Sequence, residues 1–289
     1  MTAWAEIETA LDGILDRRWY TNHGPLACRL ETEWAASSGV RHAVVVTNPT
    51  IGLIMLADAL CLAGEVLLSA LAPPRCAQAL AWAGLQPRFC DVDPVTLAPA
   101  PDATHEVRAT TIALLGTNGA DPVALAALAA EHGLILYHDG ARRGTTPALV
   151  DLPAHGDDAG AACLLTDDDQ LAARLRNIRS SYGAGTPVPV VRTVNGRLSE
   201  AQAAMALLAS PARARQIRPA PHHLGRRALP YGRDRLLIAR DPADRAALLR
   251  ELDAAGARAW PLTLDERAAH CTEAVRIAET AVILRAAAA

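Results

Sequence analysis

The sequence predicts an α/β fold with a mostly parallel sheet flanked by helices. From residue 40 onward, short apolar runs alternate with stretches rich in alanine and leucine, which is the pattern of βα units. Apolar residues make up 51% of the 289 residues, so the chain can bury a sizeable core. We therefore expect a globular protein in which helices pack against a sheet.

The apolar runs predict the strands, and the stretches between them predict the helices. Strands are expected at His42–Val46, Val66–Ser69, Pro87–Asp91, Thr111–Leu115, Leu134–His138 and Ala162–Thr166. Helices are expected at Thr50–Leu62, Cys76–Ala83, Pro122–Glu131 and Asp168–Arg179. In such sheets, binding groups gather at the carboxyl ends of the strands. The loops of interest are therefore Thr47–Ile51, Ala70–Cys76, Gly116–Asp121 and Asp139–Thr146.

The end of the chain predicts a smaller α+β unit. Sequence rich in glycine and proline follows Ser180, and a helix is expected at Leu198–Leu208. Later elements are expected as a strand at Arg235–Ile238, a helix at Asp241–Ala255 and a strand at Arg258–Pro261. The pair Asp241-Pro242 supplies the capping residue and first-turn proline of that helix.

Two domains are expected. The chain has no internal repeats, and no linker is long enough to separate independent units. A large α/β domain is expected over residues 1–200, and a small α+β domain over residues 201–289.

Charge and hydropathy argue against two classes of partner. The net charge is −3 and the pI is about 6.3, so no basic field attracts nucleic acid or anionic lipid. The longest apolar stretch, Ile51–Ala72, contains Asp58 and Glu65, which suits a helix and a buried strand better than a membrane span. The amino terminus lacks the basic start and apolar run of a signal peptide, which predicts a cytoplasmic protein.

No motif points to metal or nucleophilic chemistry. The chain has no Walker loop, no G-x-G-x-x-G and no nucleophile elbow. Its six cysteines are scattered, without a C-x-x-C pair or a cluster with histidine. We expect no metal site and reduced structural thiols at Cys28, Cys61, Cys76, Cys90, Cys163 and Cys271.

All 28 basic residues are arginine, and the chain contains no lysine. Codon bias in a GC-rich genome accounts for this at most surface positions, in keeping with the abundance of alanine and leucine. Arginine stays protonated below about pH 12, so it neither becomes a free amine nor condenses with an aldehyde. Chemistry that needs a lysine side chain is therefore not expected.

Several segments, in order, resemble one enzyme family. They are Tyr20–Leu26, Leu30-Glu31, Ser38–Val44, Trp82–Pro94, Ala130–Asp139 and Asn195–Ala204. Together they resemble the DegT/StrS family of sugar aminotransferases over nearly the whole chain. The resemblance implies the fold type I PLP-transferase fold, here with a truncated C-terminal domain. It also implies a PLP cofactor on a lysine, and a dimer across which Asn195 reaches.

The chain departs from the family where the lysine belongs. The family has a Ser-Phe-Ser-Phe stretch, the Schiff-base lysine and a Gly-Glu-Gly-Gly turn, whereas Gly156–Asp167 runs on directly. The lysine-bearing loop is missing. Some relatives carry histidine in place of the lysine and act as dehydratases, but that variant needs the same loop. His155 lies before the deletion and is a poor substitute.

The implied cofactor contacts are altered as well. Where the family places Gly-Thr at a helix start, this chain has Asn48-Pro49-Thr50, and Pro49 has no N–H to offer a phosphate. The ring-stacking aromatic falls on Pro73. Of the principal contacts, Asp139, which would pair with the pyridinium nitrogen, remains. We expect no cofactor.

The candidate catalytic residues are Asp139, His138 and Arg142. Asp139 lies at a strand's carboxyl end, and its carboxylate needs a partner, which Arg142 or Arg143 supplies. The structural alternative is a salt bridge beside an empty cleft. By strand alternation His138 points to the opposite face, where a structural role is the alternative. The pair His222-His223 lies in a predicted loop, and its role stays open.

Thr50, Arg75, Asn195 and Arg197 are the candidate substrate-binding residues. Arg75 is expected in the loop after the strand Val66–Ser69, and an arginine fork suits a small anionic substrate. For Thr50 the alternative is ordinary helix capping, and for the arginines it is a solvated surface position.

Two functions remain open. One is a PLP-independent enzyme of amino-sugar or natural-product biosynthesis that catalyses dehydration, cyclisation or isomerisation. The other is a non-catalytic subunit that completes the active site of a lysine-bearing sugar aminotransferase. The expected assembly is a homodimer or a heterodimer with such an aminotransferase.

Overall fold

The computed structural model divides the chain into two compact units, neither of which is one continuous stretch of sequence. The first unit comprises Met1–Leu62, Ala141–Gln216 and Ala288–Ala289, and the second comprises Ala63–Gly140 and Ile217–Ala287. The residues described are 4–95, 97–100, 111–117, 121–133, 135–139, 147–152, 160–182, 186–208, 227–231 and 234–284.

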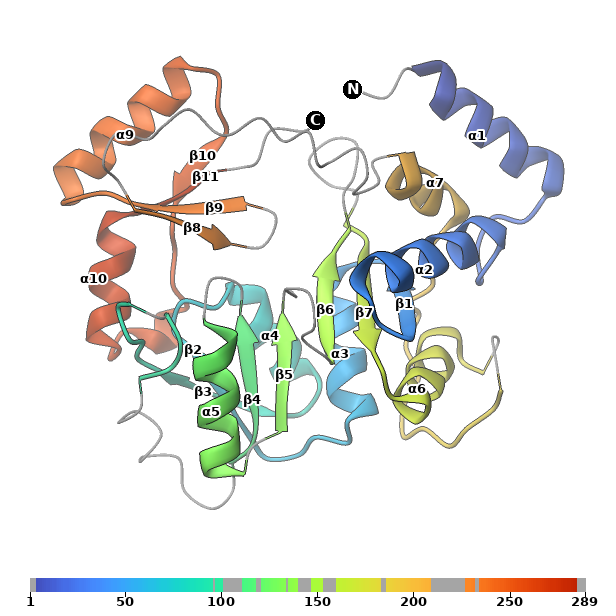
Figure 1. The fold of residues 1–289 in the computed structure, drawn as a ribbon, viewed down its shortest axis with the longest axis horizontal. Coiled ribbons are helices and arrows are strands. Elements are labelled where there is room, and N and C mark those ends of the chain that lie inside the picture. The colour runs from blue at the N-terminus through green and yellow to red at the C-terminus, as the bar shows by residue number, and fades with distance from the viewer. Residues whose placement is uncertain are drawn as a thin grey trace. The chain divides into compact units, whose positions relative to one another are not determined.

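Three antiparallel strands form the centre of the first unit, in the order β1-β7-β6 (Figure 1). They are β1 (His42–Val46), β6 (Ala148–Asp151) and β7 (Ala162–Thr166). Every residue of β7 is buried, as is typical of a strand covered on both faces. This explains why its sequence is a continuous apolar run with no polar alternation.

Helices cover both faces of these strands. The first unit contains α1 (Trp4–Arg17), α2 (Pro25–Ser38), α3 (Pro49–Ala59), α6 (Asp169–Ser180) and α7 (Glu200–Leu208). Val45 packs in one cluster with residues of α2 and α7, whereas its neighbour Val46 faces α3. A Cβ on Gly52 of α3 would lie 2.5 Å from Cδ1 of Leu149 and 3.1 Å from Cγ2 of Val46. Glycine therefore allows α3 its close approach to β1 and β6.

A distant carboxylate caps the start of α2. Gly24 is the capping position and has no side chain, and Glu200 takes over its role. The Glu200 carboxylate, which is fully buried, accepts the N–H groups of Leu26 at 2.8 Å and Ala27 at 3.0 Å. A Cβ on Gly24 would lie 2.6 Å from the Glu200 carboxyl carbon, so only glycine leaves room for this contact.

The second unit contains a parallel sheet in the order β5-β4-β2-β3. Its strands are β2 (Glu65–Ser69), β3 (Gln86–Cys90), β4 (Thr111–Thr117) and β5 (Ile135–Asp139). The helices α4 (Pro74–Trp82) and α5 (Pro122–His132) connect them. Asp121 caps α5 by accepting the N–H of Val123, and Pro122 fills the first helical position.

The same unit contains an antiparallel sheet in the order β10-β11-β9-β8 (Figure 1). It comprises β8 (Arg227–Tyr231), β9 (Asp234–Ile238), β10 (Ala259–Pro261) and β11 (Ala281–Leu284), with the helices α9 (Pro242–Ala254), η2 (Glu266–Ala268) and α10 (Thr272–Thr280). Alternate residues of β9 face opposite sides. Leu237 packs with Leu248 and Leu252 of α9, and Leu236 packs with Ile277 of α10.

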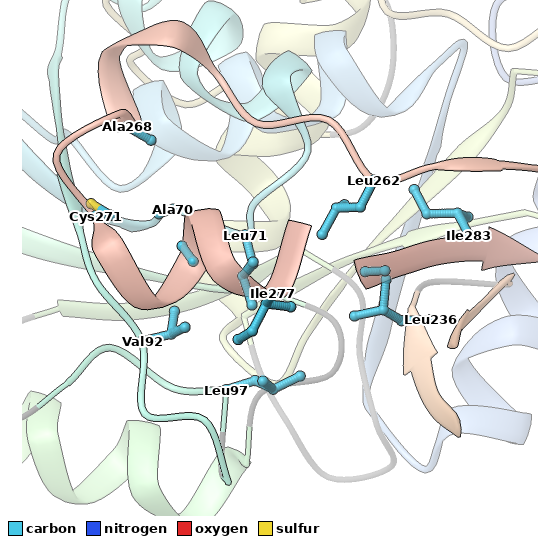
Figure 2. Close-up of a cluster of buried hydrophobic side chains, with 12 residues drawn as sticks. Ala70, Leu71, Val92, Leu97, Leu236, Leu262, Ala268, Cys271, Ile277 and Ile283 are labelled. Atoms are coloured by element: carbon cyan, nitrogen blue, oxygen red, sulfur yellow. The ribbon is translucent and has the colours of Figure 1, made fainter. Parts of the chain in front are cut away.

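The cluster around α10 joins the two sheets of the second unit. Figure 2 shows Ile277 among Leu71, which follows β2, and Val92 and Leu97, which follow β3. Asp91 fixes the helix by accepting the N–H groups of Glu273 and Ala274, each at 2.8 Å. Apolar packing and a cap thus tie α10 to the end of β3.

The predicted α/β fold class is confirmed. The strands expected at His42–Val46 and Ala162–Thr166 coincide with β1 and β7, and the other expected elements are present with bounds shifted by a few residues. The elements that were not foreseen are α1, α2, β6, β8, η2, α10 and β11. Among the described residues, no helix has the length and apolar character needed to span a bilayer. The domain division at residue 200 stays a prediction.

The Glu200 cap generates a first prediction. Glu200→Ala should lower the free energy of unfolding by about 2–3 kcal/mol, because it leaves buried N–H groups at the start of α2 unsatisfied. Urea unfolding measures this change. Glu279 is exposed in α10, and Glu279→Ala should change stability by less than about 0.5 kcal/mol. Equal effects of the two substitutions would contradict the role of Glu200.

Candidate functional site

The predicted site residues fall in both units. Thr50, Asn195 and Arg197 belong to the first unit, and Arg75, His138 and Asp139 belong to the second. The candidate catalytic residue Arg142 lies outside the described residues. The same holds for the other residues considered from the sequence, which are Arg143, His155, His222 and His223. The two groups are therefore described separately.

The start of α3 follows β1 directly and is capped by its own sequence. Asn48 has an extended backbone, with φ −161° and ψ 162°, and its side-chain oxygen accepts the N–H of Ile51 at 2.8 Å. The Asn48 carbonyl accepts the N–H of Gly52 at 3.0 Å. Pro49 fills the first helical position and has no N–H. Among residues 49–52, all of which the structure describes, Thr50 is then the only one with an N–H that has no partner.

A segment from after α6 crosses the start of α3. The N–H of Thr47 donates to the carbonyl of Gly196 at 3.1 Å, and the N–H of Gly196 donates to the carbonyl of Arg179 at 3.2 Å. A Cβ on Gly196 would lie 2.7 Å from Sδ of Met55 and 3.3 Å from Cγ2 of Ile51. A side chain at this position would therefore require the Met55 side chain to move.

Asn195 and Arg197 flank this glycine and differ in their surroundings. Asn195 is exposed, whereas Arg197 is half-buried and donates from Nη2 to the carbonyl of Ser180 at 3.3 Å. Asn195 and Arg197 thus lie in the segment that bonds to Thr47, the residue just before Asn48. Thr50, half-buried in α3, lies in the same unit.

A buried ion cluster lies under the crossing segment. Glu31 of α2 accepts from Nη1 of Arg179 at 2.6 Å, from the N–H of Val45 at 3.1 Å, and contacts Nε2 of His23 at 2.9 Å. Arg179 also donates to the carbonyl of Val45 at 2.8 Å and is only 2% exposed. Burial alone would raise the pKa of Glu31, but the hydrogen bond from His23 and the charge of Arg179 outweigh it and lower that pKa.

This cluster was not predicted from the sequence. Arg179 was assigned only to a helix, and Glu31 only to a segment of the family resemblance. The two residues are 148 positions apart, and no short motif links them. The residue types give no signal either, because α2 also contains Arg29 and Glu33, and α6 also contains Arg174 and Arg176.

In the second unit, His138 and Asp139 end β5. Their backbones pair in register with Gly116 and Thr117 of β4, which places both at the carboxyl end of parallel strands, as expected. His138 is buried, and this burial lowers its pKa, which keeps the imidazole neutral at pH 7. A neutral imidazole retains a nitrogen that accepts a proton or a hydrogen bond. For Asp139 the structure describes the backbone alone.

Arg75 occupies a helix and not the loop in which it was expected. The helix α4 begins at Pro74, earlier than the predicted Cys76, and Arg75 lies in its first turn. Two prolines, Pro73 and Pro74, precede it, and both are compatible with a helix start. Arg75 is half-buried there.

The connection between β6 and β7 is short. Asp151 pairs with Ala162, and the N–H of Leu152 donates to the carbonyl of Ala161 at 2.9 Å. Residues 152–161 are all the sequence that lies between the two strands. The resemblance places the Schiff-base lysine at this point of the chain, and neither this connection nor the rest of the sequence contains one.

These residues do not match a PLP site as the resemblance implies it. No side chain supplies a primary amine, and the first turn of α3 offers a phosphate only the N–H and hydroxyl of Thr50. Pro73 stands where a stacking aromatic would be, with φ −53° and ψ 137°. In the described residues, no group of three or more His, Cys, Asp or Glu side chains is arranged to hold a metal ion.

Comparison with known proteins finds similarity to one aminotransferase family and to individual curated proteins. The model of the DegT/DnrJ/EryC1/StrS aminotransferase family matches residues 2–146. The dTDP-4-amino-4,6-dideoxy-D-glucose transaminase of Escherichia coli is 35% identical over 89 residues, which cover 31% of this chain and 24% of the relative. The pleiotropic regulatory protein of Geobacillus stearothermophilus is 30% identical over 207 residues, which cover 63% of this chain and 55% of the relative. The chain thus spans less than two thirds of either relative.

Solved structures confirm the predicted fold type I architecture. The crystal structure of DesI in the presence of its TDP-sugar product has a TM-score of 0.78 and 25% identity, and the likeness covers 99% of this chain and 86% of DesI. The E. coli GDP-4-keto-6-deoxy-D-mannose-3-dehydratase with bound hydrated PLP has a TM-score of 0.74 and covers 100% of this chain and 94% of that protein. At 17% identity, the second likeness shows the fold alone.

The ion cluster generates a second prediction. Glu31→Gln should lower the free energy of unfolding by about 3–5 kcal/mol, because it leaves the Arg179 guanidinium buried without its charged partner. Urea unfolding measures the loss. The matched control lies in the same helix: Arg29 and Glu33 form an exposed pair, and Glu33→Gln should cost less than about 1 kcal/mol.

The contribution of Glu31 should also depend on pH. Because the folded state lowers its pKa, the stabilisation is complete above the ordinary carboxyl value of about 4.3 and is lost as the pH falls toward the folded value. The stability difference between the natural chain and Glu31→Gln should therefore shrink in acid. A difference that stays constant from pH 7 to pH 3 would show that Glu31 does not act through its charge.

Proposed function

Because the chain belongs to the DegT/DnrJ/EryC1/StrS aminotransferase family, we propose that it serves amino-sugar or natural-product biosynthesis without a PLP Schiff base. The observation that carries this proposal is the short connection between β6 and β7. Residues 152–161 join the paired strands and contain no lysine. An imine between PLP and a side chain needs a primary amine, which arginine does not provide at any accessible pH.

The proposed activity is a PLP-independent dehydration, cyclisation or isomerisation. Such reactions need a group that removes a proton and another that stabilises developing negative charge. We assign the first role to Asp139 or His138 and the second to Arg142. The support is the place of His138 and Asp139 at the end of β5, and the neutral state of the buried His138 imidazole.

The proposed substrate is a small anion. The E. coli relative is named for a dTDP-sugar, and a nucleotide-linked sugar carries negative charge. We assign its binding to Thr50, Arg75, Asn195 and Arg197. Arginine presents a planar fork of donors that matches carboxylate and phosphate oxygens, so these arginines supply attraction and orientation together.

A second candidate function is that of a non-catalytic subunit beside a lysine-bearing sugar aminotransferase. The observation that favours it is the geometry of Asn195, which is exposed on a segment that backbone hydrogen bonds hold at Thr47 and Arg179. An exposed polar residue on a fixed segment is suited to contact with another chain. In this case the partner supplies the lysine and the cofactor chemistry.

The third prediction tests the absence of a Schiff base. Protein purified with a lysine-free tag should show no bound absorbance near the visible edge after incubation with PLP and desalting. Borohydride reduction and peptide mass spectrometry should find an adduct at most on the α-amino group of the first residue. A lysine-bearing sugar aminotransferase treated in parallel provides the positive control. An adduct on an internal peptide of the folded chain would overturn the proposal.

The fourth prediction concerns assembly. Light scattering at micromolar concentration should give about twice the 30.4 kDa of one chain, or a complex with an aminotransferase captured by pulldown. Asn195→Trp should weaken the dimer, whereas Asp253→Trp, at an exposed position of α9, should not. A stable monomer for which no partner is captured would contradict the expected dimer. A heteromer with a lysine-bearing enzyme would favour the subunit function over the enzyme.

A further inference from the structure

We infer that the amino-terminal turn of α3 is closed to phosphate by the chain's own residues, so that the ligand of this chain presents no phosphate group there. The inference rests on the proposed function and narrows its substrate. The anionic group of that substrate is held by side chains elsewhere, such as the arginine forks, and not by the helix start. The ligand is thus restricted to molecules without a phosphate group at the start of α3. The likeness to PLP enzymes alone would not suggest this restriction.

The closure follows from the donors of the first turn. An anion at a helix start is held by the backbone N–H groups that have no partner within the helix. Pro49 has no N–H, and the N–H of Ile51 is occupied by the side chain of Asn48 at 2.8 Å. Within the helix, Thr50 retains a free N–H and a hydroxyl, so this turn presents a phosphate with fewer donors than an uncapped helix start does.

The crossing segment occupies a further donor. The N–H of Thr47, just before the cap, donates to the carbonyl of Gly196. A Cβ on Gly196 would crowd the side chains of Met55 and Ile51 of α3. The carbonyl that takes the Thr47 N–H is thus held firmly and presents an oxygen, which repels an anion, beside the helix start.

The same device begins another helix of this chain. At α9, Asp241 has φ −155° and ψ 173°, accepts the N–H of Asp244 three residues on, and precedes Pro242. Asn48 and Pro49 reproduce this arrangement at α3 in each respect. The start of α3 is therefore built as a structural cap.

The experiment opens the turn. In phosphate-free buffer, calorimetric titration of the natural chain with inorganic phosphate should show no saturable binding that depends on Thr50. Pro49→Ala restores one N–H, and Asn48→Gly with Pro49→Ala frees a second. Each added charge-assisted donor should tighten phosphate binding about tenfold. Circular dichroism should show that the variants remain folded, because the lost cap costs only about 1 kcal/mol by itself.

Two comparisons keep the result specific. Asp241→Gly with Pro242→Ala frees the same donors at α9 and should tighten phosphate binding as well. No gain at either helix would show that the caps do not exclude phosphate and would overturn the inference. If the natural chain binds phosphate and Thr50→Ala weakens that binding, the inference is overturned. Binding that Thr50→Ala leaves unchanged places the anion elsewhere and agrees with it. Inorganic phosphate cannot form an imine, so this result is independent of the borohydride test.

Discussion

The arrangement of the first unit depends on one buried carboxylate. Glu31 lies on α2, and its partners come from β1 through Val45, from α6 through Arg179 and from the residues before α2 through His23. Apolar packing is not directional, so it alone would tolerate small shifts of α2 and α6 against the strands. An ionised carboxylate in the interior tolerates none, because losing a partner exposes the full cost of burying its charge.

This constraint extends to the start of α3 through the backbone. The carbonyl of Arg179 holds Gly196, and the carbonyl of Gly196 holds Thr47, so the ion cluster sets the position of the crossing segment. The segment in turn packs on α3 at Gly196, where a Cβ would crowd the Met55 side chain. Asn195 is exposed and Arg197 is bonded to Ser180 as consequences of that position. The positions of Asn195 and Arg197, two of the candidate binding residues, therefore depend on the segment that the Arg179 backbone holds.

Most helices that the sequence predicted have local caps, although α4 was predicted and has no capping side chain. α3, α5, α6 and α9 each begin after an Asn or Asp that bonds to its own first turn, and each was expected. The starts of α2 and α10 have no capping side chain of their own. Their caps are Glu200 and Asp91, more than 170 positions away along the chain. No local sequence pattern predicts the start of such a helix, and for this reason α2 and α10 were not predicted.

The same difference between local and distant information divides the site. The missing N–H of Pro49 was predicted from the sequence, whereas the hydrogen bond from the Ile51 N–H to Asn48 was found only in the structure. The pairing of Arg179 with Glu31 was also found only in the structure.

The ion pair between Arg179 and Glu31 shows which roles arginine can fill in a chain without lysine. A guanidinium that never loses its charge suits a buried ion pair better than an ammonium does, because it keeps its partner satisfied at every pH. The same permanence removes amine chemistry, since a group that cannot deprotonate cannot attack an aldehyde. Exclusive use of arginine is thus compatible with the buried ion pair, and it leaves the chain without a side-chain amine.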